Sequence, residues 1–218
     1  MKTLAIEFAS ERRSVAVLRE GVVTGRAEES GGRHARAFAL IERALAEAGM
    51  VREEIEHIAV GLGPGSYAGI RSAIALAQGW QLGRAISVSG VGTVECLAAQ
   101  AAEQGGRGTA AVLIDAQRNE FYSATYVLEG ADVAPRCVEP LRIISFEAAC
   151  TLAAERLLIW PGLQERFSRG DVLLPDAGMV GRLAGIEGAS GMRGADLEPV
   201  YLRETNFVKA PPARVIPD

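Results

Sequence analysis

The first half of the chain alternates short apolar stretches with segments of helical periodicity. Three stretches of strand length come first, at residues 3–8, 14–18 and 22–27. Residues 34–48 then repeat apolar positions at helical spacing and end beside Gly49, a common C-terminal residue of helices. The same reading predicts strands at 57–62 and 85–88 and helices at 67–82, with Ser66 as N-cap, and 93–103. We therefore expect three strands, a helix, a strand and further helices in this half.

A similar order of elements begins again in the second half. Strands are predicted at residues 109–114, 120–126, 137–144 and 157–160, and helices at 146–155 and 176–183. The order strand-strand-strand-helix-strand thus occurs twice, without a visible repeat of individual residues. This order is typical of the ribonuclease-H-like fold, and two tandem copies indicate the actin-like (ASKHA) α/β class. We expect two lobes with mixed sheets, flanking helices and a ligand-binding cleft between them.

The predicted domain boundaries follow from this duplication. An N-terminal lobe should span residues 1–106 and a C-terminal lobe residues 107–205. Residues 206–218 contain three prolines and should form an extended tail, because proline disfavours helices and central strands.

Composition and charge narrow the classes of function. The 218 residues are 49% hydrophobic, enough for a sizeable core, and the net charge of −4 with scattered basic residues argues against tight direct binding to nucleic acid. Cys96, Cys137 and Cys150 lack the spacing of a metal site or disulfide framework. The start lacks a signal-peptide pattern and no apolar run reaches membrane-spanning length, so we expect a cytoplasmic protein with no membrane partner.

A glycine-rich segment before the helix at 67–82 is the most distinctive motif. It reads Gly61-Leu62-Gly63-Pro64-Gly65-Ser66-Tyr67-Ala68-Gly69-Ile70-Arg71. Glycines let backbone N–H groups gather around a phosphate at a helix N-terminus, but they equally let another backbone pack closely. The segment lacks the Lys-Ser/Thr of a Walker A loop. A weak anion site at Gly63, Gly65 and Ser66 and a tight packing turn therefore both remain open.

The first strand of each half ends in one carboxylate, Glu7 in the first half and Asp115 in the second. In actin-like phosphotransferases such residues hold Mg²⁺ or its waters beside nucleotide phosphates, and a nearby hydroxyl such as Ser10 would contact phosphate. The simpler interpretation is that each carboxylate caps the turn that follows it, and we favour it because the motif evidence is weak. An ATP-binding hydrolase or phosphotransferase that uses Glu7, Ser10, Asp115 and the glycine segment is the alternative function.

The histidines and the helices complete the list of candidates. His34 and His57 form no His-x-x-x-His pair, so we expect no metal site of the zinc or iron type, and no motif marks a catalytic nucleophile. The helices predicted at 34–48 and 67–82 carry alanines and other apolar residues outside a single stripe. Such helices are either buried on two sides within the lobe or present a second face to a partner.

The glycine-rich segment, together with other stretches, resembles the TsaB (YeaZ) family of the bacterial machinery that makes threonylcarbamoyladenosine in tRNA. The similarity extends over about the whole chain. The supporting stretches are Arg33-His34, Ala77-Gln78-Gly79, residues 114–122 and Pro199-Val200-Tyr201-Leu202-Arg203. The chain departs from the family at the end of the first strand, where Glu7-Phe8-Ala9 stands in place of a frequent Asp-Thr-Ser. That departure argues against nucleotide binding by the first lobe.

The resemblance implies a non-catalytic scaffold that dimerises with a TsaD-like enzyme, which holds a metal through His-x-x-x-His and transfers the threonylcarbamoyl group. It further implies a homodimer when the chain is alone, a TsaE-like ATPase docked on the heterodimer, and contact with tRNA only through the complex. No cofactor is required, and whether ATP or ADP binds at an interface of the complex is left open. The implied partner contacts are Phe38, Ile41, Leu45, Tyr67, Ile70 and Ile74.

Overall fold

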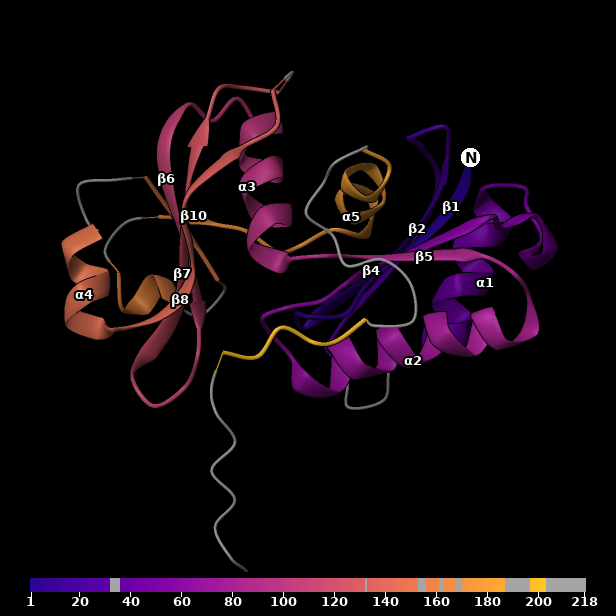
Figure 1. Ribbon diagram of the computed structural model, residues 1–218, viewed down its shortest axis with the longest axis horizontal. Helices are drawn as coiled ribbons and strands as arrows, with labels where there is room; N and C mark the ends of the chain where they lie inside the picture. Colours follow the sequence, from indigo (N-terminus) through magenta and orange to yellow (C-terminus); the bar gives the residue numbers. More distant parts are fainter. Residues whose placement is uncertain are drawn as a thin grey trace, which may run out of the picture.

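The structure, a computed structural model, describes residues 1–31, 36–131, 133–152, 156–160, 163–167, 170–186 and 197–202. His34, Arg203 and the predicted tail at 206–218 lie outside the described residues. The described residues form two five-stranded mixed sheets with helices packed on and between them (Figure 1).

The first sheet is a three-stranded antiparallel meander extended by two parallel strands. Its strands are β1 (Lys2–Glu7), β2 (Arg12–Arg19), β3 (Val22–Ser30), β4 (His57–Gly61) and β5 (Ser87–Val91). They lie in the order β3-β2-β1-β4-β5, with β4 parallel to β1 and β5 parallel to β4. All five residues of β4 are buried, as expected for a parallel strand covered on both faces.

The second sheet repeats this arrangement. Its strands are β6 (Gly108–Asp115), β7 (Glu120–Leu128), β8 (Arg136–Ser145), β9 (Arg156–Ile159) and β10 (Asp171–Val172). Their order, β10-β9-β6-β7-β8, pairs β6 antiparallel with β7 and parallel with β9, as β1 pairs with β2 and β4. The predicted duplication of the actin-like core is therefore confirmed at the level of strand order.

Two of the helices, one from each half of the chain, pack on the sheet of the other half. α1 (Ala37–Glu47) and α2 (Tyr67–Gly83) cover one face of the first sheet, and α5 (Ala177–Ala184) covers the other (Figure 1). α3 (Thr93–Glu103) packs instead on the second sheet, where Leu97 and Ala101 join the core around Val112. The remaining helical segments are α4 (Phe146–Thr151), η1 (Arg52–Glu54) and η3 (Leu163–Glu165).

This exchange of helices joins the two lobes. Gly181 of α5 lies so close to Leu18 and Ala5 of the first sheet that a Cβ atom at this position would collide with Leu18. Each half thus supplies one helix to the sheet of the other, which a division into residues 1–106 and 107–205 does not describe. Within the described part of the chain, every helix is too short or too polar to cross a membrane.

Four of the six predicted partner contacts belong to the core of the first lobe. Ile41 and Ile70 are fully buried, and Leu45 and Ile74 are 3% and 6% exposed. Their side chains pack with the first sheet, so the prediction that they touch a partner is wrong. The apolar stripe that suggested an interface is the stripe that this chain buries itself. Phe38 and Tyr67, in contrast, are exposed.

Candidate functional site between the lobes

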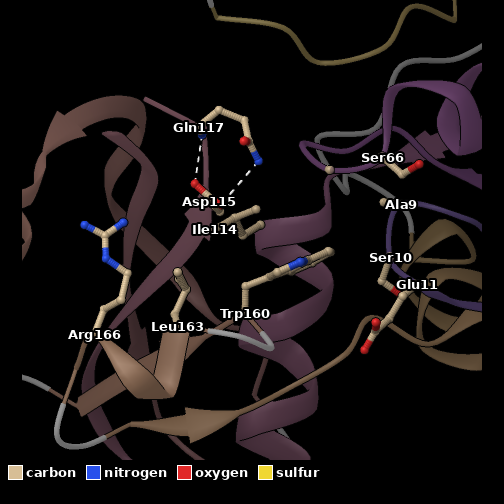
Figure 2. A pocket seen from close by; sticks show the side chains of 11 residues that line it. Ala9, Ser10, Glu11, Ser66, Ile114, Asp115, Gln117, Trp160, Leu163 and Arg166 are labelled. Carbon is tan, nitrogen blue, oxygen red and sulfur yellow. Dashed lines mark hydrogen bonds between the residues drawn. The ribbon is translucent and has the colours of Figure 1, made fainter. Parts of the chain in front are cut away.

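A pocket of about 410 Å³ opens between the lobes, beside the turns that follow β1 and β6 (Figure 2). The first lobe contributes Ala9, Ser10, Glu11, Gly65 and Ser66, and the second contributes Ile114, Asp115, Gln117, Trp160, Leu163 and Arg166. Four of the predicted nucleotide contacts, Ser10, Gly65, Ser66 and Asp115, are therefore brought together here. Glu7 and Gly63 are not among the lining residues.

The glycine segment packs against the chain's own backbone. A Cβ atom on Gly65 would collide with the Ala9 carbonyl, and one on Gly69 would collide with the Phe8 carbonyl. Ser66 N–H donates to the Ala9 carbonyl at 2.7 Å, while Ser66 Oγ accepts from Gly69 N–H at 3.3 Å and caps α2 as predicted. The packing interpretation of these glycines is thus the one that the structure supports, because the loop must approach the β1–β2 turn closely.

The two carboxylates play matching structural roles. Glu7 Oε1 accepts a hydrogen bond from Ala9 N–H at 2.6 Å, and Asp115 Oδ1 accepts one from Gln117 N–H at 2.8 Å. The other Asp115 oxygen accepts from Gln117 Nε2 at 3.2 Å. Each acid therefore caps the turn two residues after its strand, as the simpler interpretation predicted.

Glu7 is also electrostatically unusual. Its side chain is fully buried against Gly61, where any Cβ atom would collide with the carboxyl group. Burial raises the pKa of Glu7 to about 7, Asp176 adds to the rise, and the bond from Ala9 opposes it. Its Oε2 atom has no hydrogen-bond partner among the described residues. In the chain alone, this carboxyl group is therefore partly neutral near pH 7.

The turn after β6 forms one wall of the pocket. Gln117, Arg118 and Asn119 all have positive φ angles, 65°, 57° and 64°, which non-glycine residues rarely adopt. Besides the Asp115 cap, Arg166 holds this turn by donating to Asn119 Oδ1. The Arg166 guanidinium also lies over the Phe121 ring, 5.0 Å from its centroid. The turn is thus fixed from both sides.

Trp160 and Arg166 are the two largest of the pocket residues that the sequence analysis did not propose as contacts. Trp160 packs against the cores of both lobes, and its backbone N–H donates to the Leu113 carbonyl at 3.0 Å. Trp160 was predicted only as the end of a strand, and Arg166 carried no motif. The ionisable groups lining the pocket are Glu11, Asp115 and Arg166. Two acids and one guanidinium that already contacts Asn119, Phe121 and Phe146 make a poor site for a triphosphate.

His57 has a structural role. It is 6% exposed, and its two ring nitrogens lie 2.8 Å from Ser87 Oγ and 2.9 Å from Ser89 Oγ. The imidazole thus ties β4 to β5. Within the described ranges, no three His, Cys, Asp or Glu side chains come together as a metal site would require.

A second hollow lies on the outer side of the first lobe, between α1 and α2. We call it the α1–α2 groove; its volume is about 480 Å³. Six of its lining residues are apolar or small, namely Phe38, Ala75, Leu76, Gly79, Trp80 and Gly83, and three are charged, namely Arg52, Glu53 and Arg84. Among the described residues nothing lies within 4 Å of a Cβ atom built on Gly79 or Gly83. This part of α2 is open.

Comparison with known proteins places the chain in a family. The family model described as "TsaD: tRNA N6-adenosine threonylcarbamoyltransferase" matches residues 7–162. The TsaB protein of Escherichia coli K12 is 30% identical, over 98% of this chain and 100% of that protein, and that of Haemophilus influenzae is 27% identical, over 95% and 96%. The structure of YeaZ from Pseudomonas aeruginosa, 29% identical, superposes with a TM-score of 0.76 over 92% of this chain and 99% of that chain. The chain therefore belongs to the TsaB (YeaZ) family of tRNA threonylcarbamoyladenosine biosynthesis proteins.

Proposed function

We propose that this chain is a non-catalytic subunit that pairs with a TsaD-like threonylcarbamoyltransferase through the α1–α2 groove. Pairing supports the transfer reaction on tRNA, which the chain reaches only through the complex. A TsaE-like ATPase docks on the pair, and a homodimer forms through the same groove when the enzyme is absent. Membership of the TsaB family and the shape of the groove support this proposal.

The observation that carries the proposal is Gly79. It lies in the interior of α2, where glycine costs about 1 kcal/mol relative to alanine. Because no described residue approaches its Cβ position, packing among the described residues does not require a glycine there. Ala75 lies one turn earlier and Gly83 one turn later on the same row of the helix. A row of small residues lets the backbone of a partner helix come close.

The surroundings of the groove fit a protein partner. Phe38 on α1 is 62% exposed and Leu82 on α2 is 91% exposed. Burying a large apolar side chain of this kind contributes about 1.5–3 kcal/mol to association before its costs are counted. The lining combines apolar and aromatic residues with Arg52, Glu53 and Arg84, and protein interfaces likewise combine apolar and aromatic side chains with arginine and other charged residues.

The groups that could act as catalysts already have other roles. Glu7 and Asp115 cap turns, and His57 joins two strands through Ser87 and Ser89. These roles favour a scaffold over an enzyme that works alone.

Gly79→Gln tests the proposal, because glutamine is a good helix former that would fill the groove. Ala148→Gln is the matched control, since Ala148 is an exposed helical residue on α4, at the other end of the molecule (Figure 1). We expect the wild type and the control to co-elute with the TsaD-like enzyme of the same organism in size-exclusion chromatography. Gly79→Gln should weaken pairing at least about tenfold.

A cellular assay completes this test. A deletion strain should lose threonylcarbamoyladenosine from its tRNA, and the control variant but not Gly79→Gln should restore it. The proposal would be contradicted if tRNA in the deletion strain were still fully modified. It would also be contradicted if a folded Gly79→Gln variant paired with the TsaD-like enzyme as the wild type does.

Nucleotide binding in the pocket between the lobes is a second candidate. The convergence of Ser10, Gly65, Ser66 and Asp115 on that pocket favours it. The hydrogen bonds that Asp115 and Ser66 already make weigh against it, and calorimetry with ATP and Mg²⁺ distinguishes the two cases.

A further inference from the structure

Residues 197–202, which we call the C-terminal strap, return to the first lobe after α5. Leu197 is 4% exposed and packs in the core beneath α1 and α2. Val200 N–H donates to the Leu62 carbonyl at 2.8 Å, next to the glycine segment. The strap is the yellow segment that runs beside the start of α2 in Figure 1. It is thus anchored to the first lobe on both sides of Pro199.

Tyr201 of the strap contacts Tyr67, the first residue of α2. The two ring centroids are 5.1 Å apart and the rings are tilted by 31°. Arg71, one turn along α2, donates to Tyr67 Oη and places its guanidinium 5.1 Å from the Tyr67 centroid. We call Tyr67 and Tyr201 the tyrosine pair. Contacts with Arg71 and the anchored strap hold the pair in place.

The tyrosine pair keeps about half of its surface in solvent although it is held in place. Tyr67 is 57% exposed and Tyr201 is 40% exposed. Tyrosine and arginine are enriched among the residues that dominate binding energy in protein interfaces. Rings that are already positioned lose little side-chain freedom on binding, so more of their contact energy appears as affinity.

The position of the pair on α2 connects it with the α1–α2 groove. Tyr67, Arg71, Ala75 and Gly79 are spaced by four residues and form one row along the helix. The groove lies at one end of this row and the tyrosine pair at the other. A partner that lies along α2 and fills the groove would therefore reach the pair.

The charges near the pair favour a protein over RNA as the occupant. Stacking of a nucleobase on tyrosine is normally combined with several cations that hold the phosphates. Among the described residues, Arg71 is the cation that contacts the pair, and the chain as a whole carries a net charge of −4. One guanidinium beside two rings instead matches a protein surface with an apolar hollow and an adjacent carboxylate.

We propose that the tyrosine pair is a second anchor for the protein partner that occupies the α1–α2 groove, so that the partner covers the C-terminal strap as well as α1 and α2. This inference rests on the proposed function. The partner surface opposite Tyr201 is apolar, and a carboxylate beside it pairs with Arg71. Both halves of the chain then contribute to one interface, because the strap brings residue 201 beside residue 67.

Titration of the TsaD-like enzyme with Tyr201→Ala, Tyr201→Phe and wild-type chains tests this inference by calorimetry. Tyr201→Ala should weaken binding at least about tenfold, whereas Tyr201→Phe keeps the ring and should bind within about threefold of the wild type. Val133→Ala, which shortens an exposed side chain beyond β7 in the second lobe, is the control and should bind as the wild type does. Without partner, the melting temperature of Tyr201→Ala should stay within about 2 °C of wild type, because an exposed ring adds little to folding.

The outcomes separate this inference from the proposed function. If Gly79→Gln binds weakly but Tyr201→Ala binds as the wild type does, the inference is wrong and the proposed function stands. If the wild-type chain does not bind the enzyme, both fail. If the chain alone binds tRNA and Tyr201→Ala weakens that binding, the tyrosine pair contacts RNA and the proposed protein anchor is wrong.

Discussion

Replacing Glu7 with glutamine should make the stability of the protein less sensitive to pH. Glu7 is fully buried at the end of β1, with one oxygen bonded to Ala9 N–H and Oε2 without a hydrogen-bond partner among the described residues. Burial is the main reason that its pKa lies near 7 rather than at the ordinary value of 4.5. The folded protein therefore binds this proton more tightly than the unfolded chain does.

The sign and size of the effect follow from these two pKa values. Because the pKa is higher in the folded state, the contribution of the neutral carboxyl group is fully present below about pH 4.5 and is lost as the pH rises through 7. A difference of about 2.5 in pKa, at about 1.36 kcal/mol for each, corresponds to roughly 3 kcal/mol. Glutamine has a similar shape and no charge, so it avoids this loss.

Urea unfolding between pH 4.5 and 8.5, followed by the fluorescence of Trp80 and Trp160, measures the effect. The free energy of unfolding of Glu7→Gln minus that of the wild type should rise by about 3 kcal/mol across this range. The constant cost of placing an amide in the site cancels in this comparison. Glu11→Gln removes an exposed carboxylate from the same turn and controls for a general change in charge. A difference that stays constant across the range would refute the reasoning, since Glu7 would then be ionised in the folded protein at low pH.

Three further predictions concern the loop, the core and the pocket. Gly69→Ala should destabilise the chain by about 1–3 kcal/mol, because the new methyl group would collide with the Phe8 carbonyl; an unchanged urea midpoint would contradict this close packing. Ile74→Glu should lower the free energy of unfolding by more than about 3 kcal/mol by placing a charge in the core, and a variant of normal stability that merely fails to pair would return Ile74 to the interface. Calorimetry with ATP and Mg²⁺ should give no saturable heat, since both Asp115 oxygens accept hydrogen bonds from Gln117; micromolar binding that Asp115→Ala abolishes would show the opposite.

The sequence by itself determined the elements and much of their order. Helix α3 occupies the predicted range, Ser66 caps α2, and strand order repeats between the sheets as the two runs of elements suggested. These features depend on periodicity, caps and turns, which are local properties of the chain. The two residues of β10 were missed because so short a strand has no periodicity.

The candidate pocket could be predicted in part, because some of its residues also carry local sequence signals. Strand ends and the glycine segment indicated Ser10, Gly65, Ser66 and Asp115, because such positions lie at one edge of a sheet whatever surrounds them. Trp160 and Arg166 complete the pocket from segments without a motif. Their places depend on how the second lobe packs.

Only the tertiary structure decided which apolar residues the chain buries and which it leaves exposed. The apolar stripes that include Ile41 and Ile70 predict buried helix faces, but periodicity does not say whether this chain or another covers those faces. The exchange of α3 and α5 between the sheets, and the return of the strap to place Tyr201 on Tyr67, join residues far apart in the chain. Such contacts are chosen by the fit of whole surfaces, which no local pattern records.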